Sequence, residues 1–248
     1  MGAYLLLVCA AFAAGVINSV AGGGSFLTFP ALVFTGVPSV IANASNTLAL
    51  FPGLFASAWA YRDDFKKSEG FPFRPMLIVS LAGGITGALL LLFTPQRTFD
   101  AVIPWLMLGA TLLFTFGPRA SPILQRMFHI GPITLICIQV PVAIYGGYFG
   151  AAIGILMLAV WSLFGLKDIH VMNANKTLLG GSINAVAVVL FVIARKIWWP
   201  QTLVMLVAGV IGSYIGARTA KAVNPRYVRN AITVISLAIT IAFFLRRH

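Results

Sequence analysis

Long apolar segments alternate with short polar or glycine-rich stretches along the whole chain. Segments of about 18 apolar residues or more with few charges are typical of transmembrane helices. The pattern therefore predicts an all-α, polytopic membrane protein. Ten apolar segments can be separated, at residues 3–20, 26–34, 41–61, 75–93, 101–116, 130–145, 151–164, 171–194, 203–217 and 231–245.

Two of these segments, residues 26–34 and 151–164, are too short to cross a bilayer. A helix of about 12 residues is only ~18 Å long, whereas the hydrocarbon core is roughly 30 Å thick. We therefore expect two broken or re-entrant helices and eight full transmembrane helices, four in each half. If the short segments instead gave five crossings per half, the two halves would be inverted relative to each other.

Residues 18–47 hold two polar clusters inside otherwise hydrophobic sequence. Three consecutive glycines break a helix, since each costs about 1 kcal/mol relative to alanine. A break exposes backbone N–H and C=O groups, which at membrane depth must be buried in protein or must line a wet cavity. The stretch therefore indicates a binding site. Its candidate residues are Asn18, Gly22, Gly23, Gly24, Ser25, Asn43, Ser45, Asn46 and Thr47.

The second half of the chain repeats this region about 130 residues later. Residues 173–178 are NANKTL where residues 43–48 are NASNTL, and the glycine-rich residues 146–154 occupy the place of the first glycine cluster. GGITGA at 83–88 and GSYIGA at 212–217 form a third pair of similar segments. Many secondary transporters contain such duplications. We therefore predict a first repeat at residues 1–117, a linker at 118–129 and a second repeat at 130–248.

Composition supports the membrane class, because 60% of the residues are hydrophobic and only 9% are charged. The net charge is +12, but the basic residues lie almost entirely in loops. That placement is typical of topology signals and of contacts with anionic lipids, and it does not indicate nucleic-acid binding. Basic residues divide ten to five between the two sides with either eight or ten crossings. Charge therefore does not decide the topology, although both versions place residues 62–74 in the cytoplasm.

Lys176 is the only basic residue well inside a hydrophobic segment. An ionisable group in the bilayer is costly and suggests a function, although a lysine can also snorkel or bond to backbone carbonyls. As a functional group it would neutralise an anion, while neutral amides, hydroxyls and helix N-termini would bind oxyanion oxygens. Helix-to-helix hydrogen bonding is the alternative for each neutral residue. Besides those of the first half, the neutral candidates are Asn173, Asn175 and Thr177.

Several chemistries lack the residues they need. All acidic residues lie in or beside loops, so no carboxylate in mid-membrane would relay a proton or hold a cation. The sequence has no hydrolase triad, zinc-protease or ATP-binding motif. Cys9 and Cys137 stand alone, which disfavours a disulfide or a metal site. We expect no enzyme activity, no cofactor and no metal; any coupling would depend on the substrate's own protonation or on ions held by carbonyls.

Residues 18–32, NSVAGGGSFLTFPAL, followed by ANASNT at 42–47, resemble the sulfite exporter TauE/SafE family of bacterial membrane permeases. Residues 148–150 with Gly154, and NANKT at 173–177, resemble the second-half motif of that family, and they add Tyr148 and Gly150 to the site candidates. Ala152 departs from the motif at a position where glycine is expected. The resemblance covers nearly the whole chain. It implies a multi-pass permease that exports a small sulfur-containing anion, sulfite or an organosulfonate, across the inner membrane.

We therefore expect the two broken regions to meet near the midplane and to form one anion site around Lys176. The expected partners are a small anionic substrate and the lipid bilayer, without nucleic acid, and the sequence leaves a homo-oligomer open. Two alternatives remain for the function. One is a permease for another small organic anion such as a short carboxylate, and the other is a membrane component that anchors a partner complex without transport.

Overall fold

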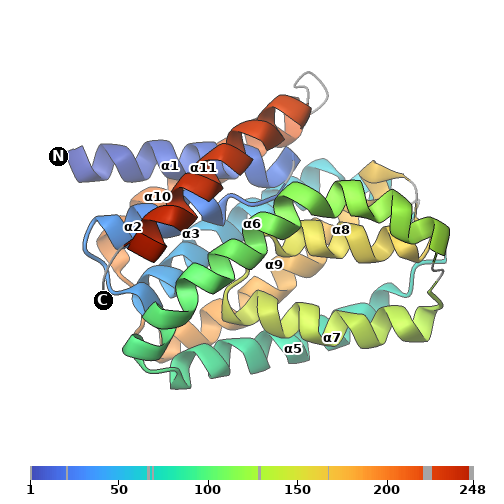
Figure 1. Ribbon diagram of the computed structural model, residues 1–248, viewed down its shortest axis with the longest axis horizontal. Helices are drawn as coiled ribbons and strands as arrows, with labels where there is room; N and C mark the ends of the chain where they lie inside the picture. The colour runs from blue at the N-terminus through green and yellow to red at the C-terminus, as the bar shows by residue number, and fades with distance from the viewer. Residues whose placement is uncertain are drawn as a thin grey trace.

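Helices form every regular element in the part of the chain that the structure describes. The computed structural model describes residues 2–20, 22–65, 68, 70–127, 130–166, 168–219 and 225–245. The expected all-α fold is therefore confirmed for these residues. The helices (Figure 1) are α1 Gly2–Val20, α2 Ser25–Phe34, α3 Ser39–Ala60, α4 Arg62–Phe65, α5 Phe73–Phe93, α6 Gln96–Met127, α7 Pro132–Tyr148, α8 Ile153–Leu163, α9 Ile169–Ile193, α10 Trp199–Thr219 and α11 Pro225–Leu245.

Six helices within the described residues are long and apolar enough to cross a membrane: α1, α3, α5, α6, α9 and α10. The shorter apolar helices are α2, α7, α8 and the Asn230–Leu245 part of α11. The chain is thus a multi-pass membrane protein, while the expected count of eight full crossings is not confirmed. The two short apolar segments of the sequence are α2 and α8, which are 10 and 11 residues long.

Both glycine-rich regions interrupt a helix, as the sequence predicts. Between α1 and α2, Gly22 and Gly23 have φ angles of 76° and 96°. Between α7 and α8, Gly150 has a φ of 74° and Ala152 a φ of 59°. Positive φ is easy for glycine but strained for alanine. The sequence resemblance leads us to expect glycine at position 152, and the backbone of Ala152 adopts the conformation that glycine favours.

Small residues let the closest helix pairs touch backbone to backbone. α1 packs along α10, and a Cβ added to Gly15 would lie 2.7 Å from the backbone nitrogen of Ser213. α5 packs along α7, and a Cβ added to Gly87 would lie 2.7 Å from the backbone nitrogen of Tyr148. In Figure 1, α1 follows one edge of the bundle, α5 and α7 follow the opposite edge, and α3 and α9 lie between them.

The central helices α3 and α9 run in opposite directions and pack against each other. Near the start of α3, the Ser45 hydroxyl accepts a hydrogen bond of 2.9 Å from the backbone N–H of Trp198, which follows the end of α9. Near the start of α9, Asn175 Nδ2 donates a 2.8 Å bond to the hydroxyl of Ser68, which follows the end of α3. The beginning of each central helix is therefore hydrogen-bonded to the chain segment that follows the other central helix.

α6 continues to Met127 and so includes most of the linker predicted at 118–129. Phe128 and His129 lie outside the described residues. The division into two repeats stays a prediction at this level. Five of the basic residues counted for the topology also lie outside the described residues, namely Lys66, Lys67, Lys221, Arg246 and Arg247.

Ala152→Gly is expected to cost less stability than Ala151→Gly. Both alanines are buried, at 3% and 1% exposed, and both substitutions remove one methyl group. Only Ala152 has a positive φ, so only its replacement relieves backbone strain of about 1–2 kcal/mol. Thermal unfolding of the two purified variants in detergent measures the difference. Equal losses of stability would show that Ala152 is not strained.

Candidate functional site

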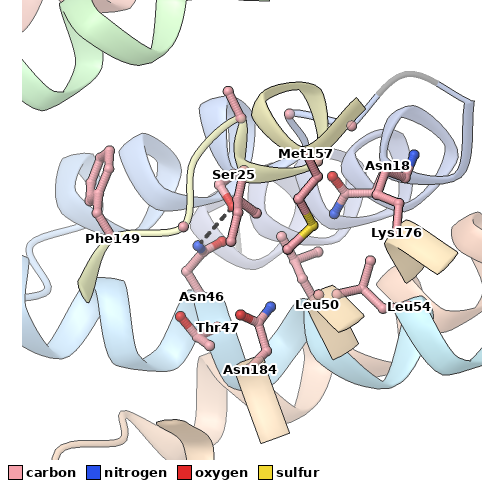
Figure 2. Close-up of a pocket in the computed structure, with 17 residues that line it drawn as sticks. Asn18, Ser25, Asn46, Thr47, Leu50, Leu54, Phe149, Met157, Lys176 and Asn184 are labelled. Atoms are coloured by element: carbon pink, nitrogen blue, oxygen red, sulfur yellow. Dashed lines mark hydrogen bonds between the residues drawn. The ribbon is translucent and has the colours of Figure 1, made fainter. Parts of the chain in front are cut away.

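A pocket lies where the two helix breaks meet the central helices α3 and α9 (Figure 2). Its volume is about 50 Å³, which is space for roughly four water-sized groups. That size suits a small oxyanion. The lining residues are Asn18, Gly22, Gly23, Ser25, Asn46, Thr47, Leu50, Leu54, Phe149, Gly150, Ala152, Ile153, Gly154, Met157, Lys176, Gly180 and Asn184.

The structure brings eight of the fifteen site candidates together around this one space. They come from both halves of the sequence, and the two breaks supply the glycines. A single cavity therefore collects the amide, hydroxyl and ammonium groups that the sequence places in separate motifs. The eight are Asn18, Gly22, Gly23, Ser25, Asn46, Thr47, Gly150 and Lys176.

The remaining seven candidates do not line the pocket, and several of them support residues that do. The backbone N–H of Gly24 donates a 2.7 Å hydrogen bond to Asn18 Oδ1. Asn173 Oδ1 accepts a 2.8 Å bond from Lys176 Nζ. These two contacts orient pocket side chains from outside. The seven are Gly24, Asn43, Ser45, Tyr148, Asn173, Asn175 and Thr177.

Other candidates hold the backbone in place. Asn43 Nδ2 donates a 2.9 Å bond to the carbonyl of Tyr148, the last residue of α7. The Tyr148 ring packs against Phe99, and its hydroxyl lies 3.4 Å from that of Thr94, so this side chain is engaged elsewhere. Thr177 donates to the carbonyl of Asn173, within its own helix. Ser45 and Asn175 make the connections between α3 and α9 described above.

Lys176 enters the pocket from α9 and is only 3% exposed. Its Nζ donates to Asn173, and Figure 2 shows Lys176 and Asn18 at the same end of the pocket. The methylene chain passes Gly154, where an added Cβ would lie 2.9 Å from Lys176 Cδ. Within the described residues, no carboxylate lies at salt-bridge distance from this ammonium. A buried charge without a counter-charge is costly, so the site favours an anion.

Asn46, on α3, presents its amide group to the same space. Its Oδ1 accepts a hydrogen bond from the Thr28 hydroxyl, and its Nδ2 donates a 3.3 Å bond to the Ser25 hydroxyl. Figure 2 shows this Asn46 to Ser25 bond at the pocket. Because Thr28 donates to the carbonyl oxygen and Ser25 accepts one amide hydrogen, the second amide hydrogen of Asn46 and the hydroxyl hydrogen of Ser25 remain for a ligand with acceptor oxygens.

The sequence analysis missed Asn184 and Thr28. Asn184 lines the pocket eight positions after Lys176, with Gly180 between them at four. Positions spaced by four share one face of a helix, and this spacing could have identified Asn184. The same spacing from Asn46 leads to Leu50 and Leu54, which line the pocket from α3. Thr28 gave no such signal, because its hydroxyl does not line the pocket and contacts Asn46 and the carbonyl of Gly24 instead.

The sequence is similar to those of known membrane transporter proteins. The profile of the family described as sulfite exporter TauE/SafE matches residues 7–243. A probable membrane transporter protein ORF9 from Sinorhizobium sp is 30% identical over 242 residues, covering 95% of this chain and 90% of the relative. A probable membrane transporter protein of Haemophilus influenzae is 27% identical, over 95% and 92%. The probable membrane transporter protein YfcA of Escherichia coli is 29% identical, over 98% and 90%. No solved structure matches the chain significantly.

Gly154→Ala is expected to weaken anion binding by about tenfold, or ~1.4 kcal/mol. The new methyl group would lie 2.9 Å from Lys176 Cδ and would displace the lysine from its position. The measurement is the rise in melting temperature of the purified protein on addition of sulfite, since a ligand stabilises the state that binds it. Gly109→Ala is the control, because an added Cβ there meets nothing within 4 Å. An unchanged response in Gly154→Ala would contradict the placement of Lys176.

Proposed function

Because the chain belongs to the sulfite exporter TauE/SafE family, we propose that this membrane transporter exports a small sulfur-containing anion, sulfite or an organosulfonate. The membrane concerned is the bacterial inner membrane. The buried ammonium of Lys176 carries the proposal. It faces a small pocket and has only the neutral Asn173 as a hydrogen-bond partner in the described part of the chain. An anion would supply the missing negative charge.

The other pocket residues suit the oxygens of such an anion. Asn46 and Ser25 offer an amide and a hydroxyl, and the amides of Asn18 and Asn184 line the same cavity. These donors are uncharged, so they bind oxyanion oxygens without adding net charge. Phe149 and Met157 form an apolar part of the wall, which can hold the carbon end of an organosulfonate.

The two short helices add a further attraction for negative charge. α2 begins at Ser25 and α8 begins at Ile153, and both residues line the pocket. The N-terminus of a helix carries a partial positive charge and backbone N–H groups without partners in the helix. Two such ends therefore face the proposed anion from opposite halves of the sequence. This is the arrangement in which broken helices bind substrate in many secondary transporters.

We also infer that the chain consists of two repeats with inverted topology, each with five helical segments. The bond from Trp198 to Ser45 and the bond from Asn175 to Ser68 support this, because both partners of one lie 130 residues from the partners of the other. Corresponding helices also run antiparallel, namely α3 against α9 and α6 against α11, where Trp105 packs on Phe244 and Thr111 lies beside Thr240. Inverted repeats with broken helices place a site near the midplane and allow access to alternate between the two sides.

Lys176→Met is expected to abolish sulfite flux while the protein remains folded and inserted. Methionine keeps the approximate length of the side chain and removes the charge that would neutralise the anion. Efflux of labelled sulfite from proteoliposomes is the measurement, with taurine, sulfoacetate, sulfate and acetate as competitors. Lys196→Met is the matched control, because Lys196 is exposed beyond the end of α9.

Each result separates one part of the proposal from the others. Unchanged sulfite flux in Lys176→Met would remove Lys176 from the site. Stronger competition by acetate than by the sulfonates would favour a short carboxylate as the cargo. If the folded and inserted wild type moved none of these anions, the transport proposal would fail, and a role in anchoring a partner complex would take its place.

A further inference from the structure

We propose that Lys176 takes up one proton with each monovalent anion and releases both together, so that transport is electroneutral. The proposal rests on the proposed function, because it requires the anion to bind beside this lysine. It goes beyond that function by naming the group that carries the proton. No carboxylate inside the membrane is needed for this coupling.

The first support is that no carboxylate among the described residues pairs with the Lys176 ammonium. Lys176 is 3% exposed, and its Nζ donates 2.8 Å to a neutral amide oxygen. The acidic residues that the structure describes lie in the four-residue helix α4, near the start of α6 or directly before α9. Asp168 begins α9 and accepts from the backbone N–H of His170, while Asp100 accepts from Ser39 and Gln96 at the start of α6.

The helices packed against α9 supply no counter-charge either. They are α3, α4, α5, α7 and α8. The hydroxyl of Tyr145 donates to the carbonyl of Ala151, and the hydroxyl of Tyr61 donates to that of Ser19. These helices and their ends also carry charged or titratable groups. Within the described residues, none of these groups bonds to Lys176. Those groups are Tyr61, Arg62, Asp63, Asp64, Arg74, Cys137, Tyr145 and Tyr148.

The charge of the lysine must therefore follow the presence of the anion. In the loaded site, the neutral amine, a proton and the anion combine to give an ammonium paired with the anion, and the total charge is zero. In the empty site, a lone buried ammonium costs several kcal/mol. A lysine loses its proton readily when it is buried, so the proton leaves with the anion. The amine is then neutral while the empty binding site returns to face the first side of the membrane.

This cycle predicts how net transport depends on the membrane potential. Moving one elementary charge across the membrane changes the driving force by about 2.3 kcal/mol per 100 mV. When a proton accompanies each monovalent anion, that dependence vanishes. The gradients of the anion and of pH then set the direction and rate of net transport.

The test uses the wild-type protein in proteoliposomes with labelled methanesulfonate. This anion stays deprotonated throughout the working pH range, so any proton that moves with it must be carried by the protein. A pH-sensitive dye inside the vesicles reports protons, and potassium with valinomycin sets the potential. The expected result is one proton for each anion and a net flux that the imposed potential does not change. Flux that follows the potential without a pH change would overturn the proposal.

Lys176→Arg separates binding from proton transfer. A guanidinium pairs with an anion but does not lose its proton in proteins. The variant is therefore expected to retain exchange of anion for anion, while net flux falls at least tenfold because the empty site cannot return without a buried charge. Lys196→Arg is the control and should keep both activities. Net flux at the wild-type rate in Lys176→Arg would contradict the proposal.

The two proposals fail in different ways. If the folded wild type moved neither sulfite nor methanesulfonate, the proposed function would be wrong. If it moved methanesulfonate electrogenically, the function would stand and only the proton coupling would be wrong. If Lys176→Arg lost exchange as well as net flux, the proton and voltage measurements on the wild type would decide whether transport is coupled to a proton.

Discussion

A broken helix inside a membrane must find partners for the backbone groups that the break exposes. The polar residues of this chain satisfy that requirement first. Asn43 donates to the carbonyl of Tyr148, and the Tyr145 hydroxyl donates to the carbonyl of Ala151, so the break after α7 is covered on its carbonyl side. At the other break, the backbone N–H of Gly24 donates a hydrogen bond to Asn18 Oδ1. Only because these groups are satisfied can both breaks remain beside a small cavity.

The cavity also depends on a firm frame around it. Glycines bring α1 against α10 and α5 against α7, close enough that backbone touches backbone. A buried hydrogen bond of 2.8 Å from Gln139 to Ser80 joins α7 to α5 away from the pocket. Packing through small residues and hydrogen bonds between helices are the main attractive forces available in lipid. The broken helices are therefore held between two pairs of tightly packed helices.

The sequence predicted the all-helical class, both breaks and the approach of the two motifs to one cavity, because glycine clusters and buried polar residues have direct physical consequences in lipid. It could not sort the residues within each motif. In NASNTL, Asn46 and Thr47 line the pocket, while Asn43 bonds to the backbone of α7 and Ser45 to the backbone of the segment before α10. All four are similar in polarity, and only the rotation of α3 about its axis separates them. Asn184 lies outside the motifs, so its role required the three-dimensional arrangement.

The two proposed repeats differ in the side chains that would meet the ion. Asn46 in the first corresponds to Lys176 in the second, and Leu54 corresponds to Asn184. A lysine at both places would bury two like charges around one small cavity, and a lysine at neither would leave an anion without a counter-charge. One lysine facing one amide gives the site a single positive charge. One monovalent anion would balance such a site, so the proposed binding of the anion and the proposed uptake of its proton both require only this one lysine.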